Sequence, residues 1–290
     1  MALPQSALAR LRTSNCLVVV SLLVLASLTF SVGPSHAAAA SCTAKSPISK
    51  SYIKKWAKAH HASRYQIVVK DLTSGCKYTA GKQSTTYPTA STMKLMVAVR
   101  ILEQVTKDEL SLSSVKGDLE KMIRVSDDAA AQRLFEKVGS GKAITSIAKR
   151  FKLKKTRSSY SKGTTQTTAA DQAKFFEAVI VNRPKSLGEP EHEFLLSLLD
   201  SVVASQRWGF GSGLPDGWSA RGKNGWYHTK LTDAPPVNRS RVNTIGVIYD
   251  NKDQPRWVVA AFSDNWATTP QGIAAWKALN KRIASKFAGS

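Results

Sequence analysis

The chain has 290 residues, 42% of them hydrophobic and 21% charged, so it can build a packed core and does not belong with disordered proteins. Its 42 Lys and Arg residues against 20 Asp and Glu residues give a formal net charge of +22 at pH 7. The sequence has no collagen-like repeat, no long heptad pattern and no series of apolar segments of about 20 residues, which excludes fibrous and polytopic membrane proteins.

Residues 1–37 have the pattern of a secretory signal peptide. Arg10 and Arg12 precede an apolar run over residues 17–30, and small residues follow up to Ala37. The run is shorter than the about 20 residues that a membrane span needs, so a retained N-terminal anchor is the less favoured alternative. We expect cleavage after Ala37 and a secreted, extracytoplasmic protein. Losing 37 residues and two arginines leaves residues 38–290, which are 253 residues with a net charge of +20.

Two cysteines, Cys42 and Cys76, remain after this cleavage. An even number of cysteines in an exported protein favours a disulfide bond, which would join the start of the mature chain to the second predicted strand. Two unpaired thiols are the alternative. Cys42 lacks the apolar residue that usually stands three positions before a lipoprotein cysteine, so lipid attachment is not expected.

The positive charge predicts attraction to polyanions. Lys and Arg are scattered along the chain in short runs, such as residues 152–155, and no helix-turn-helix, zinc-finger or ribonucleoprotein motif accompanies them. We therefore expect association with an anionic cell wall and not with nucleic acid. No metal or other cofactor is expected, because Glu191-His192-Glu193 lacks the second His of a zinc helix. Nothing in the sequence demands more than a monomer.

In chain order, an amphipathic helix is predicted first, over residues 49–60, because Tyr52, Ile53 and Trp56 share one face. A hairpin follows, with strands at 65–72 and 76–82. The next segment has helical spacing, with helices predicted at 93–105, 115–125, 127–138, 142–150, 168–181 and 189–205. The last elements are strands at 218–230, 241–250 and 256–263 and a closing helix at 270–287.

This order predicts an α/β (α+β) fold: an antiparallel five-stranded sheet flanked by the N- and C-terminal helices, with an all-helical lobe inserted between the second and third strands. We expect one domain over residues 38–290. Its α/β lobe would cover about 45–87 and 214–290, and its helical lobe about 88–213. Lobes that are discontinuous in the sequence place a cleft at their junction.

Ser91 lies where a predicted helix begins, and Lys94 follows one turn later on the same face. A serine hydroxyl becomes a nucleophile when a base takes its proton. A lysine that is buried near the positive end of a helix dipole can lose its charge and act as that base. The alternative for this S-x-x-K pattern is a helix cap followed by a surface lysine.

Two further motifs carry polar groups at element boundaries. Ser126-Asp127-Asp128 lies between two predicted helices, where a helix cap is the alternative reading. Lys223-Asn224-Gly225-Trp226 lies on a predicted strand, and its glycine permits another backbone to approach closely. The alternative there is a turn with a solvated lysine.

In this order the three motifs resemble those of the active-site serine penicillin-recognising enzymes, which include class A β-lactamases and D-alanyl-D-alanine peptidases. Thr164-Thr-Gln-Thr-Thr168 and Asn243-Thr-Ile-Gly246 support the resemblance, which covers most of residues 45–290. It is strongest to β-lactamase-like secreted serine hydrolases of actinobacteria. A second Ser-Asp-Asn, at residues 263–265, follows Lys-Asn-Gly in the chain and does not fit the family's order.

The resemblance implies a role for each matching residue. Ser91 would form an acyl-enzyme, Lys94 would accept its proton, Ser126 would pass a proton to the leaving nitrogen, and Lys223 would hold the substrate carboxylate. The substrate-binding residues would be Asp128, Asn224, Gly225 and Trp226. The backbone N–H groups of Ser91 and Trp226 would bind the oxyanion.

The chain departs from the family pattern in ways that bear on its activity. Asp128 stands where Asn is usual and Asn224 where Thr or Ser is common, and the interval from Ser91 to Ser126 is compressed, so one wall of the usual cleft is expected to be missing. Class A β-lactamases carry a Glu that activates the deacylating water, but residues 151–163, the corresponding stretch, contain no acid. We therefore expect slow deacylation, unless Asp128 reaches the water site.

Three functions follow from the sequence. The first is a serine hydrolase acylated at Ser91 by β-lactams. The second is a D-alanyl-D-alanine carboxypeptidase or penicillin-binding protein that acts on peptidoglycan peptides. The third is a catalytically silent cell-wall binding protein with the same fold.

Overall fold

A computed structural model describes residue 42 and residues 45–158, 164–231 and 237–287 of the chain. The predicted signal peptide lies outside these residues. All the helices and strands belong to one compact unit, Ala40–Ser290. No described helix is long and apolar enough to cross a membrane.

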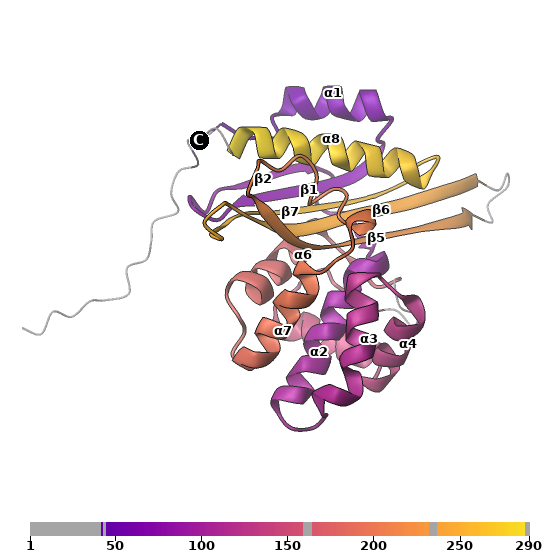
Figure 1. Cartoon of the computed structure of the whole chain (residues 1–290). Coiled ribbons are helices and arrows are strands. Elements are labelled where there is room, and N and C mark those ends of the chain that lie inside the picture. Colours follow the sequence, from indigo (N-terminus) through magenta and orange to yellow (C-terminus); the bar gives the residue numbers. More distant parts are fainter. Residues whose placement is uncertain (1–41, 43–44, 159–163, 232–236, 288–290) are drawn as a thin grey trace, which may run out of the picture. The chain divides into compact units, whose positions relative to one another are not determined.

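An antiparallel sheet with strand order β2-β1-β7-β6-β5 forms the centre of this unit (Figure 1). Its strands are β1 (Arg64–Asp71), β2 (Lys77–Gly81), β5 (Ser219–Leu231), β6 (Val237–Tyr249) and β7 (Pro255–Asp264). The strands of the hairpin and the last three strands are therefore joined as predicted. The prediction of an antiparallel five-stranded sheet is confirmed.

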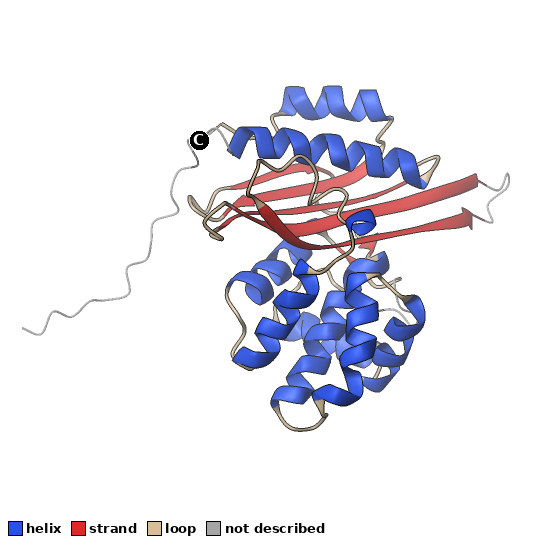
Figure 2. Cartoon of the chain, in the orientation of Figure 1, coloured by secondary structure: helices blue, strands red, loops and turns tan. Residues whose placement is uncertain are grey.

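The terminal helices cover one face of the sheet, and the inserted helices cover the other (Figure 2). The first group is α1 (Lys50–His60) and α8 (Thr269–Phe287). The second group is the 3₁₀ turn η1 (Ala90–Met93), α2 (Lys94–Thr106), α3 (Leu112–Arg124), α4 (Asp128–Lys137), α5 (Gly141–Arg150), α6 (Ala169–Phe176), the π turn η2 (Glu177–Val181), α7 (Glu189–Asp200) and the 3₁₀ turn η3 (Ala204–Gln206). The predicted helix at 168–181 is thus α6 continued by η2.

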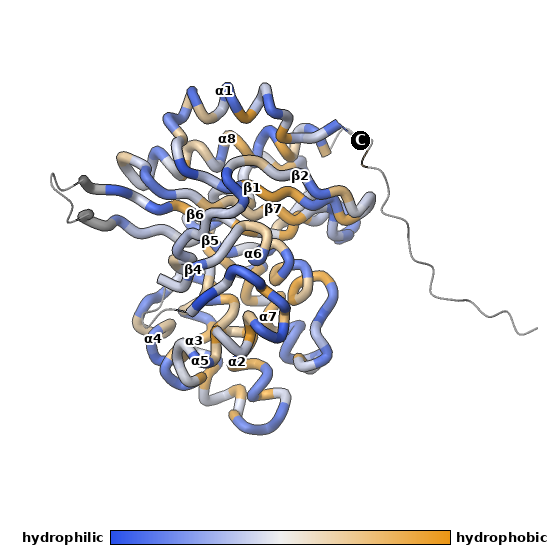
Figure 3. Tube along the Cα trace, turned by 180° about the vertical axis from the view of Figure 1, so that it is seen from behind, coloured by the Kyte–Doolittle hydropathy of each residue, from blue (hydrophilic) through white to orange (hydrophobic). Residues whose placement is uncertain are grey.

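Covering both faces explains why β1 and β7 have uninterrupted apolar runs at residues 67–69 and 257–262 (Figure 3). In β1, Ile67 and Val69 pack toward the terminal helices and Val68 toward the inserted helices, and none of the three is exposed. On the outer side Trp56 of α1 stacks on Trp276 of α8 with ring centroids 5.1 Å apart. Both tryptophans belong to the core, and for Trp56 this agrees with its place on the predicted apolar face of the first helix.

Helix α2 is the central helix of the inserted lobe. It contacts α3, α4, α5 and α7, and its residues from Lys94 to Val99 are all buried. Because other helices pack closely around α2, its first turn is fixed in place. The residues at the start of α2 are therefore fixed as well.

A disulfide joins Cys42 to Cys76, with Cα atoms 5.5 Å apart, which confirms the predicted pairing. The sequence did not reveal a short ladder between β3 (Tyr87–Pro88) and β4 (Gln166–Thr167). Two-residue strands show no alternation, and a proline in one of them removes a backbone donor. This ladder precedes η1 and ties it to the segment before α6.

Candidate active site

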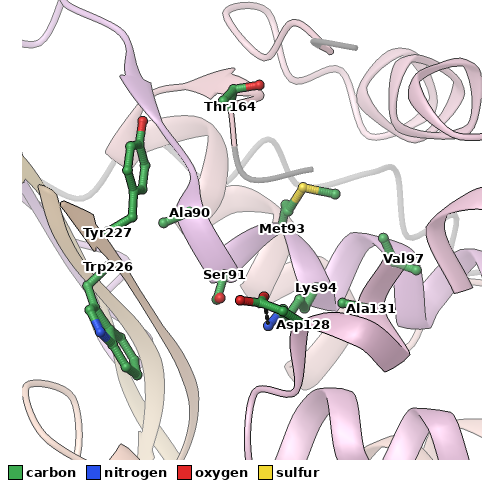
Figure 4. Close-up of a pocket in the computed structure, with 10 residues that line it drawn as sticks. All are labelled: Ala90, Ser91, Met93, Lys94, Val97, Asp128, Ala131, Thr164, Trp226 and Tyr227. Carbon is green, nitrogen blue, oxygen red and sulfur yellow. Dashed lines mark hydrogen bonds and ion pairs between the residues drawn. The ribbon is translucent and has the colours of Figure 1, made fainter. Parts of the chain in front are cut away.

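A cavity of about 190 Å³ opens beside η1 (Figure 4). Of the predicted site residues, Ser91, Lys94, Asp128 and Trp226 line it. The described lining does not include Ser126, Lys223, Asn224 or Gly225, although the hydroxyl of Ser126 accepts from Lys94. The remaining lining residues are Ala90, Met93, Val97, Ala131, Thr164 and Tyr227.

Ser91 is positioned by hydrogen bonds to the residues just before it. Thr89 donates its N–H to the carbonyl oxygen of Thr165 at 2.8 Å, and the side-chain amide of Asn243 donates to the carbonyl oxygen of Pro88 at 2.8 Å. Ala90 has a φ of 49°, a left-handed conformation that non-glycine residues adopt at a cost of about 1–3 kcal/mol. The surrounding bonds hold this strain next to the candidate nucleophile.

The hydroxyl of Ser91 makes no hydrogen bond within the described part of the chain. Its oxygen faces the cavity beside Lys94 and Asp128 (Figure 4). A substrate carbonyl in this cavity can therefore reach it without displacing a protein partner.

Two ammonium groups converge on the hydroxyl of Ser126, between α3 and α4. Nζ of Lys223 donates to Ser126 Oγ at 2.8 Å, and Nζ of Lys94 donates to the same oxygen at 3.1 Å. Lys94 also donates to the carbonyl oxygen of Ser126 at 2.5 Å. Ser126 itself has a φ of 60°, so a second strained residue lies at this site. A hydroxyl between two amines is well placed to pass protons between them.

Asp128 forms an ion pair with Lys94. Its Oδ1 lies 2.9 Å from Nζ of Lys94, and Asp127 caps α4 by accepting from the N–H of Ala130 at 2.6 Å. The Asp128 side chain is 76% exposed, whereas that of Lys94 is 4% exposed. The carboxylate therefore offers the buried ammonium a counter-charge at the cavity wall.

Lys223 is buried with only 1% of its surface exposed. Burial, and then the positive charge of Lys94, lower the pKa of Lys223 from 10.5 to about 7, and the charge of Asp128 opposes this. Near neutral pH its amine is therefore divided between charged and neutral forms, a condition common at sites of proton transfer.

Gly225 lets the backbone of β5 approach that of η1 closely. A Cβ added at Gly225 would lie 2.7 Å from the backbone nitrogen of Ser91 and 2.8 Å from that of Thr92. No side chain fits there. The close contact brings the backbone of Trp226, the next residue of β5, to the wall of the cavity that holds Ser91.

Asn224 holds a loop, and its side chain does not line the cavity. Its Nδ2 donates to the carbonyl oxygens of Gln206 at 2.8 Å and Trp208 at 2.7 Å. Trp208 in turn packs edge-on against Trp226, with ring centroids 5.7 Å apart. Asn224 thus supports Trp208, which packs against Trp226 in the cavity wall. A contact between the Asn224 amide and substrate stays a prediction from the family pattern.

Sequence reasoning did not single out Tyr227, which lines the cavity next to Trp226. The guanidinium of Arg241 lies 4.9 Å from the centre of the Tyr227 ring. Tyr227 directly follows Lys-Asn-Gly-Trp, and that position is the signal that could have identified it.

The Ser-Asp-Asn at 263–265 lies at the end of β7, where Asp264 pairs with Arg64 at 3.0 Å. These three residues are not among the described residues that line the cavity.

Asp128 is the only carboxylate among the described residues that line the cavity. Within the same described part of the chain no three His, Cys, Asp or Glu side chains gather in a group that could hold a metal. The polar groups available for chemistry are therefore hydroxyls, amines and backbone N–H groups around one paired carboxylate.

Comparison with known proteins identifies the family of this chain. A sequence model of the beta-lactamase enzyme family (Beta-lactamase2) matches residues 48–116 and 114–287. No curated protein sequence matches.

Solved structures match it in fold. An ancestral class A β-lactamase (GNCA) has a TM-score of 0.67 and 18% identity, covering 82% of this chain and 99% of that one. A β-lactamase from Xanthomonas campestris pv. campestris has a TM-score of 0.66 and 20% identity, covering 80% and 96%. The extended-spectrum β-lactamase TLA-3 has a TM-score of 0.68 and 16% identity, covering 81% and 97%. At such identities the likeness is one of fold.

Proposed function

Because the chain belongs to the beta-lactamase enzyme family, we propose that it is an exported serine hydrolase that β-lactams acylate at Ser91 and that deacylates slowly. The basic and apolar start of the sequence and the disulfide between Cys42 and Cys76 support export. The convergence of Ser91, Lys94 and Ser126 around one cavity supports acyl transfer.

In the acylation step Oγ of Ser91 attacks the carbonyl carbon of the β-lactam ring, and its proton passes to Nζ of Lys94. The N–H groups of Ser91 and Trp226 stabilise the oxyanion that forms. When the ring C–N bond breaks, Ser126 gives its hydroxyl proton to the nitrogen and takes a proton from a neighbouring lysine. The products are an ester at Ser91 and a ring-opened amine.

The ion pair at the cavity wall slows this step. The Asp128 carboxylate stabilises the ammonium form of Lys94, which has to lose a proton before it can accept one from Ser91. Transfer from Nζ to Oδ1 across their 2.9 Å contact is the shortest route, and it leaves a neutral amine beside a neutral carboxyl. The pairing thus adds an unfavourable proton release from Lys94 before acylation.

The main support for slow deacylation is that the described residues lining the cavity include no carboxylate besides Asp128. Asp128, the one carboxylate among the described lining residues, is paired with Lys94, and the sequence over 151–163 contains no acid. Water that attacks the ester at Ser91 needs a general base, and losing such a base typically costs about 10²–10⁴-fold in rate. A long-lived acyl-enzyme follows.

The same observation favours a second candidate, a D-alanyl-D-alanine carboxypeptidase or penicillin-binding enzyme that acts on peptidoglycan peptides. β-Lactams would trap such an enzyme because their ester persists. The Lys94–Ser126–Lys223 arrangement serves either substrate, since both reactions acylate a serine and release a nitrogen.

Two assays with the same protein separate the candidates. Release of D-alanine from a D-alanyl-D-alanine peptide, blocked by one equivalent of benzylpenicillin, would support the peptidase. Loss of benzylpenicillin over many turnovers without D-alanine release would support a β-lactamase. Activity in neither assay, with no acylation of Ser91, would leave the catalytically silent binding protein.

A further inference from the structure

A second hollow, of about 500 Å³, lies at the sheet edge opposite β5, between the β1–β2 hairpin and α6. We name it the lysine groove after the six lysines that line it: Lys70, Lys77, Lys152, Lys154, Lys155 and Lys174. They come from the hairpin, from the turn after α5 and from α6, which lie apart in the sequence.

Acidic groups neutralise only part of this charge. The described lining contains two acids, and Glu177 is paired with Lys70 at 2.5 Å. The carboxylate of Asp171 accepts from the N–H of Lys155 at 2.7 Å and from the hydroxyl of Thr156 at 2.9 Å. Within the described ranges no carboxylate oxygen lies within 4.0 Å of Nζ of any of the other five lysines, and all five lysines are exposed.

The lysines at 152–155 stand on a fixed backbone. Leu153, between them, is buried with 2% of its surface exposed, and the bonds to Asp171 anchor Lys155 and Thr156. Lys174 of α6 donates to the carbonyl oxygen of Lys152 at 3.3 Å, which joins two walls of the groove. The fold therefore holds like charges together where their repulsion is unfavourable, and a bound anion would relieve it.

The composition of the groove indicates the kind of anion. Arginine makes two-pronged contacts with carboxylates and phosphates, whereas lysine binds phosphate as a point charge without fixed geometry, and the described lining contains lysines but no arginine. Single-stranded nucleic acid is bound with aromatic side chains that stack on the bases, and the described lining contains no aromatic residue. Five exposed lysines without acidic side-chain partners are suited to bind a polymer that carries a negative charge on each repeat.

We propose that the lysine groove binds a polyanion built of repeated phosphodiester groups without bases, such as a polyol-phosphate polymer of a cell wall. The lining residues of this groove are separate from those of the cavity at Ser91. Binding there is therefore independent of acylation, and each can fail without the other.

Binding of poly(glycerol phosphate) to the full chain, measured by titration calorimetry over a range of salt concentrations, tests this. The groove variant carries Lys152→Gln, Lys154→Gln and Lys155→Gln. The matched control carries Lys54→Gln, Lys55→Gln and Lys58→Gln on the exposed face of α1, which removes the same charge elsewhere. We expect the groove variant to bind at least about tenfold more weakly with a shallower salt dependence, and the control to bind like wild type.

A variant with Lys152→Arg, Lys154→Arg and Lys155→Arg keeps the charge and should keep the affinity, which separates lost charge from lost folding. Equal losses in the groove variant and the α1 control would overturn the proposal in favour of diffuse net charge. It would also be overturned if poly-glutamate or single-stranded DNA of equal charge bound as tightly as the phosphate polymer and depended on the same three lysines.

Discussion

Nζ of Lys94 lies 2.9 Å from Oδ1 of Asp128, so the buried candidate base of this site is held in an ion pair with an exposed carboxylate. The enzymes that the chain resembles usually carry an amide at the position of Asp128. The aspartate places a negative charge at the cavity wall. Lys94 therefore has to release a proton before it can accept one from Ser91.

Asp128→Asn should accelerate acylation by β-lactams by about tenfold, because it removes the charge that stabilises the ammonium of Lys94. Deacylation should be unchanged, because the carboxylate is paired with Lys94. Stopped-flow acylation and the decay of the adduct give the two rates. Asp127→Asn is the matched control, since it removes a charge one residue away and can still cap α4. Slower deacylation in Asp128→Asn alone would instead identify Asp128 as the base for the deacylating water.

Gly225→Ala should lower the acylation rate by about 10²-fold or more, because its Cβ would lie 2.7 Å from the backbone nitrogen of Ser91 and force β5 away from η1. Gly117→Ala is the control: Gly117 is in α3, no atom lies within 4 Å of its added Cβ, and the change should stabilise the helix by up to about 1 kcal/mol. Normal acylation by a folded Gly225→Ala protein would argue against an oxyanion site between Ser91 and Trp226.

Acylation by β-lactams that carry a carboxylate should fall as the pH rises through about 7, because the ammonium of Lys223 loses its proton over that range. A β-lactam ester without the carboxylate should show no such fall. The same shift makes the contribution of Lys223 to the free energy of unfolding rise with pH between about 7 and 10.5, since there the unfolded chain binds more protons at this residue. Identical pH profiles for the acid and the ester would show that Lys223 does not act on the substrate carboxylate.

Reduction of the disulfide between Cys42 and Cys76 should lower the free energy of unfolding by about 3–4 kcal/mol, given their separation of 34 residues, and leave acylation intact. Denaturant unfolding with and without reductant measures this. In a variant with Cys42→Ser and Cys76→Ser, reductant should have no effect. An unchanged midpoint on reduction of the wild type would mean that the bond does not constrain the unfolded chain.

Much of the fold could be predicted because its elements are long and periodic. The centres of β1 and β7 are apolar on both faces because helices cover both, and α2 has a long buried apolar stretch because four helices contact it. The β3–β4 ladder could not be predicted, because its two-residue strands have no periodicity. Its partner segments lie far apart in the chain and meet only after folding.

The sequence predicted those residues near the cavity that lie in short motifs. S-x-x-K, Ser-Asp-Asp and Lys-Asn-Gly each identified residues that the fold brings near one cavity. The direction of the Asn224 side chain could not be foreseen, since it depends on the carbonyl oxygens of Gln206 and Trp208 in a loop before β5. The sequence places a carboxylate at position 128, but its pairing with Lys94 depends on α2 and α4 lying side by side.

The most direct test of the account is an intact-mass time course of the protein with benzylpenicillin, with Ser91→Ala as the control. We expect one covalent adduct per chain that forms on the wild type, persists after the free antibiotic is removed, and is absent from Ser91→Ala. Antibiotic consumed without a lasting adduct would contradict slow deacylation. An adduct on Ser91→Ala, or no reaction with either protein, would contradict the central role given to Ser91.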